Sequence, residues 1–381
     1  MIFLYKYILL IISFILLWCS AECFAAPNVS AKSAIVIENS TGRVLYEKNA
    51  HERMPMASTT KIMTAICALE NSQPDTLITV NDAAVGIEGS SIYLAKDEKI
   101  TIRDLLYGMM LSSGNDAATA LAYEVSGSVE EFAALMNKTA KSIGANSTNF
   151  VNACGLYEDE HYTTASDLAL ITAYGLKNSV FAEIVSTYQT KISNGTKDYP
   201  RTLKNHNRLL RQYDGCIGVK TGYTKKCGRC LVSSAFRDGI TLTCVTLNAP
   251  DDWNDHTALL DYGFSRCAWV SVADEDDYCT SVKVSGGTKE YVAVNFKDPL
   301  GFVSIDGVHD DVSVSYDFMP KLKAPLNEGQ SVGAASLYVS GTLCAKSELI
   351  CAQSVPLPPK KSYGELLAHN IKSFFALYSF S

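Results

Sequence analysis

The sequence predicts an α/β protein of the α+β kind, in which an antiparallel sheet flanked by helices precedes a small all-β C-terminal domain and an amphipathic terminal helix. Three observations lead to this expectation. β-type runs stand at both ends of the first part of the chain, with helical patterns between them. From Cys279 to Val355, β-type runs alternate with turn residues, and the last stretch repeats apolar residues at helical spacing. The length of 381 residues suits roughly two domains, and 47% hydrophobic residues can fill their cores.

The N-terminus has the layout of a secretory signal. Lys6 precedes an apolar run over residues 7–18, and small residues follow the run. We therefore expect a signal peptide over residues 1–25, cleaved after Ala25, and an exported protein. The alternative is a retained N-terminal anchor, but the apolar run is shorter than the ~20 residues that a membrane span needs.

The mature chain is expected to begin with a β-hairpin. The runs "AIVIE" and "RVLYE" are short β-type segments, and "NSTG" between them is turn chemistry. A helix is then expected to begin at Ser58, whose side chain can cap free backbone N–H groups. Apolar residues recur at helical spacing after it, at Ile62, Ala65, Ile66 and Leu69.

Helical patterns fill the centre of the chain. The block "TIRDLLYGMMLSSGNDAATALAYEVSG" is interrupted at residues 113–115, which predicts two apolar helices that meet at a tight, mostly buried turn. A further helix is expected in "SVEEFAALMNKTAKSIG", where Gly144 ends it. Another is expected in "TTASDLALITAYGLKNS", with Ser or Thr caps at its start.

From about residue 215 the pattern becomes β-type again. The runs "GCIGVKTGYT", "RCLVSSAF" and "ITLTCVTLNA" predict strands, and "RDG" predicts the turn between the last two. "DWNDHTALLDYGFSRC" predicts a final helix that packs back on this sheet. We therefore expect one domain over residues 28–273, with a sheet built from both ends of this segment.

The composition shifts near residue 275, where "VADEDDY" is acidic and is interpreted as a connector. The small all-β domain is expected over residues 277–356. After "PLPP", residues 360–381 predict an amphipathic helix whose apolar side chains share one face. We interpret it as a helix that lies in a membrane surface, and the alternative is docking on the protein's own β domain. The apolar face consists of Leu367, Ile371, Phe374, Phe375 and Tyr378.

Charge and cysteine content exclude some classes of function. The net charge is -7 and the basic residues are scattered, so no basic stripe is available for a nucleic-acid backbone. Of the 12 cysteines, Cys67 and Cys244 stand in apolar runs that predict buried thiols. "CGRC", with Cys227 and Cys230, is an isolated C-x-x-C and weak evidence for zinc, so no metal or cofactor is expected. A disulfide between two of Cys216, Cys227 and Cys230 is the alternative to free buried thiols.

A serine and a lysine stand one helical turn apart in "MASTTKIMTA". A serine hydroxyl is a poor nucleophile unless a base takes its proton. Lysine is normally protonated, but burial or a neighbouring cation lowers its pKa and frees the amine. Residues three apart are neighbours on a helix surface. Ser58 is therefore the candidate nucleophile, and Lys61 is the candidate general base.

Two further short motifs supply polar groups for proton relay and substrate binding. "SGN" offers Ser113 and Asn115 at the turn between two helices. "KTG" offers Lys220, Thr221 and Gly222 on a strand, where the glycine allows a substrate backbone to approach closely. Each motif alone is weak, and a second Ser-x-Asn occurs in "NSTNF". The evidence is stronger for the three motifs together, because they occur in this order and each lies in the expected structural context.

The set SxxK, SxN and KTG resembles that of the serine β-lactamases and penicillin-binding proteins. Within this group the chain is similar to the low-molecular-mass D-alanyl-D-alanine carboxypeptidases over about residues 30–270. The resemblance is dense in "PMASTTKIMTA", "LLYGMMLSSGNDAA", "NSTNFVNACGLYEDEHYTTASDLALI", "NHNRLL" and "GVKTGYTKKCGRCLVSSA". It implies a β-lactamase/transpeptidase-like catalytic domain, and the all-β domain and terminal helix match the family's layout.

The resemblance also implies roles for individual residues. Ser58 would form the acyl-enzyme and Lys61 would activate it, while Ser113 and Asn115 would serve proton transfer and substrate positioning. Lys220 and Thr221 would hold the terminal carboxylate of a peptidoglycan stem peptide ending in D-Ala-D-Ala. The backbone N–H groups of Ser58 and Tyr223 would form the oxyanion hole, beside Gly222. β-Lactams would acylate the enzyme, and its place would be the outer face of the cytoplasmic membrane or the cell-wall compartment.

The chain departs from the family pattern at one position. Glu160 stands before His161 where the family pattern leads us to expect glycine, so the loop is expected to bend differently. His161, Asp167 and Asn205 are interpreted as residues that cap helices and hold loops in place.

Three other functions are alternatives to the carboxypeptidase. The first is a β-lactamase, which would need a carboxylate for deacylation, in an E-x-x-L-N segment that this sequence lacks. The second rival is a membrane-tethered binding module that is weak in catalysis, and the third is a structural exported protein.

Overall fold

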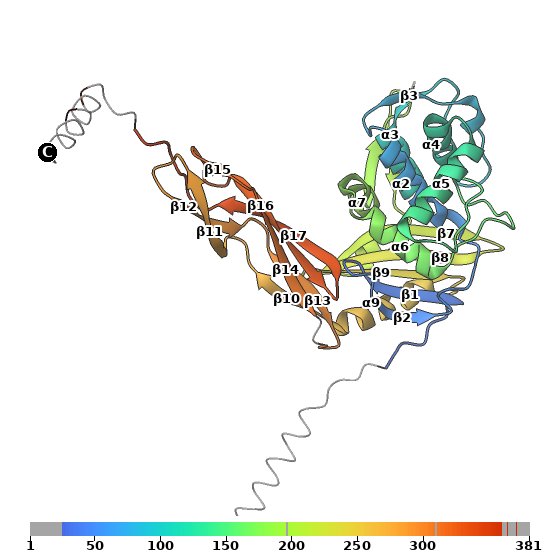
Figure 1. The fold of residues 1–381 in the computed structure, drawn as a ribbon. Helices are drawn as coiled ribbons and strands as arrows, with labels where there is room; N and C mark the ends of the chain where they lie inside the picture. Colours follow the sequence, from blue (N-terminus) through green and yellow to red (C-terminus); the bar gives the residue numbers. More distant parts are fainter. Residues whose placement is uncertain (1–24, 196, 309–310, 360–363, 365–370, 372–381) are drawn as a thin grey trace, which may run out of the picture. The chain divides into compact units, whose positions relative to one another are not determined.

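The computed structural model describes residues 25–195, 197–308 and 311–359, together with residues 364 and 371 (Figure 1). Residues 1–24 of the expected signal peptide and nearly all of the expected terminal helix lie outside the described residues. The chain forms two compact units. The first runs to Ala268 and also includes Ile305–Gly307, and the second contains Trp269–Ser304 and the residues from Val308 onward.

The first unit contains a five-stranded sheet in the order β2-β1-β9-β8-β7, in which every pair of neighbours is antiparallel. β1 pairs with β9 from Ser33 opposite Leu247 to Glu38 opposite Leu242, so the start of the chain joins strands from the end of the unit. This confirms the predicted hairpin and the sheet built from both ends. The strands are β1 (Ser33–Glu38), β2 (Val44–Lys48), β7 (Cys216–Thr224), β8 (Gly228–Arg237) and β9 (Ile240–Leu247).

Helices cover both faces of this sheet. The helix α6 contacts β1 and β9, and α9 contacts β9, β8 and β1 from the other face (Figure 1). α3, α5 and α7 pack around α2 and α4 beyond α6, and α8 contacts β7. The helices are α2 (Lys61–Asn71), α3 (Ile102–Leu111), α4 (Asn115–Ser126), α5 (Val129–Ile143), α6 (Ala165–Gly175), α7 (Ser179–Ser186), α8 (Leu209–Gln212) and α9 (Asp252–Ser265). Short pieces complete the unit: η1 (Ala57–Thr60), η2 (Asp82–Ala84), β3 (Leu77–Thr79), β4 (Lys99–Thr101), β5 (Gln189–Ile192) and β6 (Arg201–Lys204).

Local chemistry explains where several helices begin and end. Thr101, Ser128 and Thr164 each accept a hydrogen bond from the backbone N–H three residues later, which satisfies a free donor at the helix start. Gly127 and Gly144 end α4 and α5 in the left-handed conformation, with φ of 77° and 96°. Gly144 and Thr164 confirm the predicted end of α5 and the predicted cap of α6.

The start of the first long helix differs from the prediction. Ser58 lies in the 3-10 turn η1, α2 begins at Lys61, and the Ser58 side chain caps no backbone N–H group. Ala57 has a φ of 48°, so the chain turns sharply just before Ser58. The hydroxyls of Thr59 and Thr60, and not that of Ser58, bond to nearby backbone carbonyls, at 2.6 and 2.8 Å. The capping role predicted for Ser58 is therefore wrong, and its hydroxyl is left for another partner.

The second unit is all β, as predicted. Its main sheet has the order β14-β16-β17-β12-β11-β15, and β10 and β13 form a separate pair. The acidic run at residues 274–277 is a turn between β10 and β11. The buried core of this unit includes Val292, Val294, Leu337 and Leu349. The strands are β10 (Cys267–Ala273), β11 (Tyr278–Ser285), β12 (Tyr291–Phe296), β13 (Leu300–Ile305), β14 (Val312–Phe318), β15 (Leu322–Lys323), β16 (Ser331–Val339) and β17 (Thr342–Cys351).

Cys67, Cys216, Cys227, Cys230 and Cys244 are free thiols. Cys67 and Cys244 are fully buried, as predicted. Cys227 and Cys230 are buried as well. The alternative of a disulfide between two of Cys216, Cys227 and Cys230 is wrong, because none of these three residues is bonded to another sulfur. Burial raises the pKa of Cys230 to about 12, which keeps this thiol protonated.

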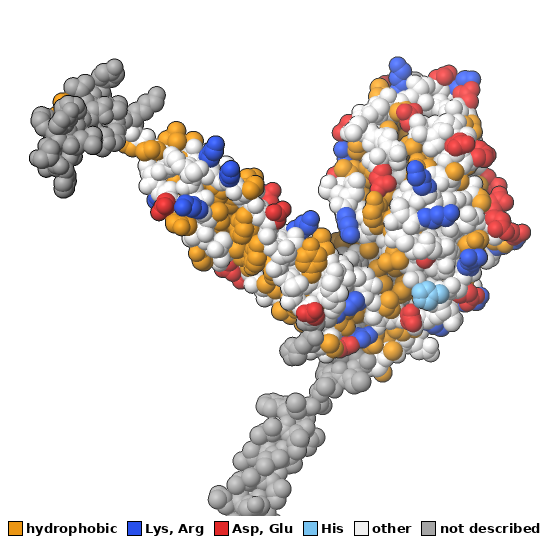
Figure 2. Space-filling view, in the orientation of Figure 1, with side chains coloured by type: hydrophobic (Ala, Val, Ile, Leu, Met, Phe, Trp, Pro, Cys, Tyr) orange, Lys and Arg blue, Asp and Glu red, His pale blue; other side chains and the backbone are white. Residues whose placement is uncertain are grey.

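The surface and the helix lengths bear on two further expectations. Figure 2 shows Lys and Arg interspersed with Asp and Glu over the first unit, without a continuous basic stripe on the face drawn. Among the described residues, no single helix is long and apolar enough to cross a membrane; α6 and α7 reach that length and hydropathy only together, and they are bent by 110°.

Candidate active site

Ser58 and Lys61 lie beside each other at the junction of η1 and α2. The Lys61 Nζ donates a hydrogen bond to the Ser58 Oγ at 3.0 Å. It also donates to the Asn115 Oδ1 at 2.7 Å and to the backbone carbonyl of Cys154 at 2.6 Å. Three acceptors therefore hold the amine in one position, with one of its contacts directed at the serine hydroxyl.

Lys61 is fully buried, which is rare for a lysine unless its charge is compensated. Burial lowers the pKa of Lys61 to about 8, an effect that Cys154 and Asp116 oppose in part. A substantial fraction of the amine is then neutral near physiological pH and can accept a proton. The structure thus provides the lowered pKa that a lysine needs in order to act as a general base.

The turn between α3 and α4 positions the second pair of residues. Ser113 has a φ of 60° and is 5% exposed, so a strained left-handed residue reverses the chain at a buried position. Its Oγ accepts a hydrogen bond from the Lys220 Nζ at 3.2 Å, while Asn115 on the first turn of α4 meets Lys61. The Asn115 Nδ2 donates to the Glu88 carbonyl at 2.6 Å, which fixes the amide orientation.

Lys220 lies on β7, which is an edge strand of the five-stranded sheet. Its side chain is 1% exposed and donates to the Thr221 carbonyl at 2.8 Å as well as to Ser113. Burial, reinforced by the charge of Lys61, lowers the pKa of Lys220 well below its usual range. Two buried lysines thus face one small volume, and protonation of either one opposes protonation of the other.

Gly222 lies where β7 passes the nucleophile. A Cβ atom on this residue would be 3.0 Å from the Ser58 backbone nitrogen and 3.2 Å from the Met56 carbonyl oxygen. A side chain here would crowd the backbone N–H of Ser58, so only glycine leaves that donor accessible from the strand. Tyr223 follows directly and is 66% exposed, at the mouth of the site.

Asp116 ties the loop in front of α4 to the site. This carboxylate is 1% exposed and accepts hydrogen bonds from the backbone N–H groups of Ile92 and Leu94 and from the Ser91 hydroxyl. A second buried carboxylate, Glu98, pairs with Arg201 on β6 through two contacts of 2.5 and 2.8 Å. The two acidic residues therefore hold both ends of the loop that forms one wall of the site.

A cavity of about 350 Å³ opens over these residues. Arg208 and Arg229 each lie 5.8 Å from the ring centroid of Trp253, and the Arg229 Nε donates to Asp252 at 2.9 Å. Sequence reasoning missed this basic and aromatic side of the site, although the alternation of asparagine with basic residues in "NHNR" was visible. The cavity is lined by Ser58, Ser90, Ser113, His206, Arg208, Thr221, Gly222, Tyr223, Arg229, Asp252 and Trp253.

All eight residues named from the sequence belong to one neighbourhood. Hydrogen bonds link Ser58, Lys61 and Asn115, and a separate bond links Lys220 to Ser113. The cavity reaches Ser58, Ser113, Thr221, Gly222 and Tyr223. Long-range pairing of β7 with the sheet and packing of η1 against β7 bring these distant segments together.

The residues interpreted as structural make structural contacts. The His161 Nε2 meets the Thr60 hydroxyl at 2.8 Å, and burial lowers the pKa of His161 to about 4, which keeps this ring neutral. Asp167 accepts from the Ser147 backbone and the Thr148 hydroxyl, both at 2.7 Å. Glu160 is absent from the positive-φ residues of the described chain, so its turn does not need the glycine that the family pattern suggested.

Two sequence families match the chain. Residues 20–251 match the family described as D-alanyl-D-alanine carboxypeptidase, and residues 270–357 match the penicillin-binding protein 5 C-terminal domain. Among curated proteins, the chain is 34% identical to the D-alanyl-D-alanine carboxypeptidase DacF of Bacillus subtilis, over 85% of this chain and 86% of that protein. It is 32% identical to the D-alanyl-D-alanine carboxypeptidase DacC of Escherichia coli, over 87% of this chain and 85% of that protein.

Solved structures give the same picture of similarity. The D-alanyl-D-alanine carboxypeptidase DacD from Francisella tularensis superimposes with a TM-score of 0.61 at 28% identity, covering 88% of this chain and 95% of that one. The Streptomyces K15 DD-transpeptidase superimposes with a TM-score of 0.60 at 35% identity, covering 63% of this chain and 99% of that one.

Proposed function

Because this chain belongs to the D-alanyl-D-alanine carboxypeptidase family of serine peptidases, we propose that it removes the terminal D-alanine from peptidoglycan stems ending in D-Ala-D-Ala. The reaction proceeds through an acyl-enzyme on Ser58. The observation that carries this assignment is the 3.0 Å contact between the Ser58 Oγ and the buried amine of Lys61. A serine with a desolvated amine at this distance has the base that acyl transfer requires.

Acylation begins when the neutral Lys61 amine takes the proton of Ser58. The Oγ then attacks the carbonyl carbon of the penultimate D-Ala, and the bond to the terminal D-Ala nitrogen breaks as that nitrogen receives a proton. Ser113 relays this proton toward the leaving amine. Asn115 keeps Lys61 aimed at Ser58 through its 2.7 Å contact and positions the substrate amide.

Lys220 and Thr221 hold the terminal carboxylate of the substrate. Support comes from the buried position of Lys220 and from its lowered pKa, because an incoming carboxylate would compensate its charge and restore protonation. A charged Lys220 in turn opposes protonation of Lys61, so substrate binding itself favours the free base. The carboxylate thus selects the substrate and helps to activate the nucleophile.

The developing oxyanion is stabilised by the backbone N–H groups of Ser58 and Tyr223. Support comes from the open approach to the Ser58 nitrogen across Gly222, where a Cβ would lie only 3.0 Å away. Preorganised backbone donors at this place need no reorganisation when charge develops. Water then hydrolyses the acyl-enzyme, with Lys61 taking one of its protons.

A β-lactam mimics the acyl-D-Ala-D-Ala terminus, so the same serine opens its ring. The remaining ring fragment stays attached and blocks water, and the acyl-enzyme is therefore long-lived. Residues 1–24 of the expected signal peptide and nearly all of residues 360–381 lie outside the described residues. The proposed location of the enzyme, exported and held at the outer face of the cytoplasmic membrane, rests on their sequence patterns.

Labelled penicillin and a D-Ala-D-Ala pentapeptide test the assignment together. We expect label on Ser58 and release of D-Ala, and both should disappear in Ser58→Ala. Label without D-Ala release would instead favour a binding module. Rapid penicillin hydrolysis without peptide cleavage would favour a β-lactamase. Absence of label on the wild-type protein, or its persistence in Ser58→Ala, would refute the assignment.

A further inference from the structure

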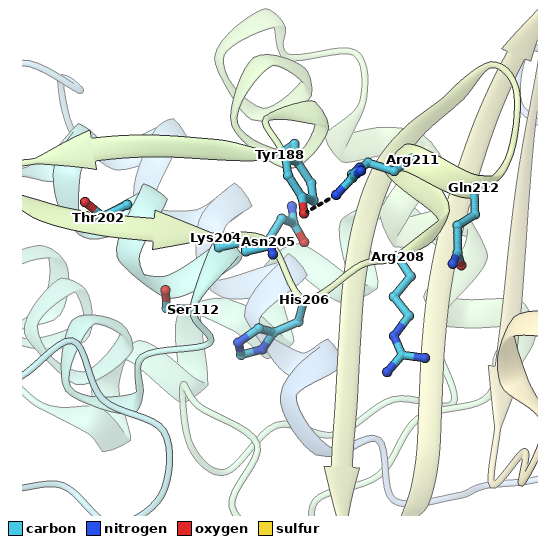
Figure 3. A pocket seen from close by; sticks show the side chains of 9 residues that line it. All are labelled: Ser112, Tyr188, Thr202, Lys204, Asn205, His206, Arg208, Arg211 and Gln212. Carbon is cyan, nitrogen blue, oxygen red and sulfur yellow. Dashed lines mark hydrogen bonds between the residues drawn. The ribbon is translucent and has the colours of Figure 1, made fainter.

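A second, larger cavity of about 790 Å³ adjoins the candidate active site. Two residues, His206 and Arg208, line both this cavity and the smaller one over Ser58. A substrate group can therefore pass from the nucleophile past these two side chains into the larger space. The larger cavity is lined by Ser112, Tyr188, Thr202, Lys204, Asn205, His206, Arg208, Arg211 and Gln212 (Figure 3).

The lining of this cavity is positively charged. It contains Lys204, Arg208 and Arg211 and no aspartate or glutamate. Within the described parts of the chain, none of these three cations has a carboxylate within ion-pair distance. Three cations gathered without a counter-charge repel one another, and an anion that entered would remove this repulsion.

Neighbouring contacts hold the cations in place. The Arg211 guanidinium donates to the Tyr188 hydroxyl at 3.1 Å, as the dashed line in Figure 3 shows, and lies 5.1 Å from the centre of the same ring. The Lys204 ammonium lies 5.5 Å from that centre. Tyr188 thus gathers two of the cations at one place in the cavity.

Buried asparagines orient the segment that joins the two cavities. Asn205 donates to the carbonyls of Val185 and Thr187 and accepts the Asn207 backbone N–H at 2.9 Å. Asn205 and Asn207 are buried, whereas His206 and Arg208 between and after them are exposed. This alternation directs His206 and Arg208 outward, and Figure 3 shows both projecting toward the lower part of the view. The shared wall is therefore fixed by the fold.

The position of the cavity relative to Lys220 shows which end of a substrate it faces. Ser112 lines the larger cavity, and the Oγ of the next residue, Ser113, accepts a hydrogen bond from the Lys220 Nζ at 3.2 Å. Under the proposed function, Lys220 and Thr221 hold the carboxylate of the residue that leaves. The larger cavity then lies next to the leaving residue, beyond His206 and Arg208.

We propose that this cavity binds a second carboxylate, carried by the side chain of the leaving residue, so that the enzyme releases acidic D-amino acid residues as well as D-alanine. This inference rests on the proposed function and extends it to the leaving-group specificity. The α-carboxylate of the leaving residue occupies the site of Lys220 and Thr221, and its side-chain carboxylate passes His206 to reach Arg208, Arg211 and Lys204.

The chemical step is unchanged by this extension. The Ser58 Oγ–carbonyl bond forms, the bond from the carbonyl carbon to the leaving nitrogen breaks, and the proton of Ser58 passes through Lys61 to that nitrogen. The methyl group of D-alanine is too short to reach the cations of this cavity, so they contribute to D-alanine binding only through long-range attraction. An acidic side chain forms charge-assisted hydrogen bonds there.

The test compares leaving residues that differ in one charge. Peptides of the form acyl-D-Ala-X are prepared with X as D-alanine, D-glutamate, D-glutamine, D-2-aminopimelate and the side-chain amide of D-2-aminopimelate. Release of X is followed for each with the full mature chain. We expect kcat/KM for at least one acid to exceed that of its amide by about tenfold, the value of one charge-assisted hydrogen bond.

Variants then locate the source of this preference. In Arg211→Gln and Lys204→Gln, the acid-to-amide ratio should fall toward one, while Arg211→Lys, which keeps the charge, should retain much of it. Lys138→Gln removes the same charge from an exposed position on α5 and should leave the ratio unchanged. Because each ratio is taken within one variant, partial unfolding cancels from it.

The outcomes separate this inference from the proposed function. If D-alanine is not released, the proposed function fails. If D-alanine is released but neither acid is preferred to its amide in the wild type, only the present inference is overturned. It is also overturned if Arg211→Gln and Lys204→Gln keep the preference. Binding of poly(glycerol phosphate) that these variants weaken, without any acid preference, would assign the cavity to a polyanion instead.

Discussion

The Lys61 amine lies 3.0 Å from the Ser58 hydroxyl and has no exposure to solvent. Water cannot stabilise the ammonium form, and the three contacts of the amine are to neutral oxygens. The pair is therefore held in the geometry and in the electrostatic environment that a serine nucleophile needs. Changes to this pair, and to the elements that support it, have measurable consequences.

Replacing Lys61 by arginine should abolish acylation. A guanidinium remains protonated at any accessible pH, so it can donate to Ser58 but cannot take its proton. We expect the rate of penicillin acylation to fall by on the order of 10³-fold or more, since a general base contributes at least this much when it acts with the nucleophile. Stopped-flow labelling measures the rate, and a near-native melting temperature would show that the fold survives. Acylation at the wild-type rate would contradict Lys61 as the base.

The acylation rate should rise with pH through the Lys61 titration. Burial lowers the pKa of this lysine to about 8, and only its neutral form is a base. The rate should therefore increase from pH 6 toward a plateau above pH 9, with a midpoint near 8 in the free enzyme. Measurement of kcat/KM or of the acylation rate at constant ionic strength tests this. A rate that falls over this range would show that the protonated form is the active one.

Substitution of Gly222 by alanine should impair acylation more than folding. The added Cβ would lie 3.0 Å from the Ser58 nitrogen and 3.2 Å from the Ala57 Cβ, so the strand or η1 must shift. Because catalytic donors tolerate little misplacement, we expect a loss of about 100-fold in kcat/KM. The φ of Gly222 is not in the left-handed region, so alanine adds no backbone strain. Full activity in Gly222→Ala would argue against an oxyanion donor at this place.

Loss of the buried carboxylate of Glu98 should destabilise the first unit and loosen the loop before α4. Glu98→Gln leaves the Arg201 guanidinium, whose side chain is 10% exposed, without its counter-charge. Breaking a buried ion pair on one side typically costs about 3–5 kcal/mol. Urea unfolding should show this loss. As a control, Glu52→Gln removes an exposed partner of Lys32 and should change stability by less than about 1 kcal/mol.

Truncation after Pro359 should release the enzyme from membranes. The apolar stripe from Leu367 to Tyr378 supplies the affinity in our proposal, and the catalytic residues all precede it. We expect the truncated mature protein in the supernatant, with its D-Ala release intact, and the full-length mature protein in the membrane fraction. Equal partitioning of the two proteins would refute the anchor.

Several features of this protein could be predicted from the sequence because they depend on local chemistry. The β1–β2 hairpin, the helix end at Gly144, the cap at Thr164 and the turn at 113–115 each follow from residue types within a few positions of one another. The three short motifs were recognised for the same reason, since their residues are adjacent in the chain.

Only the tertiary structure decided the environment of these residues. The burial of Lys61 and Lys220, the contact of Lys61 with the Cys154 carbonyl, and the closeness of Gly222 to Ser58 depend on elements far apart in the sequence. The same holds for Ser58, whose predicted capping role failed because the packing of η1 against β7 and α2 leaves its hydroxyl to Lys61. A pKa is set by desolvation and by charges brought near in space, and neither quantity is encoded in the spacing of residues along the chain.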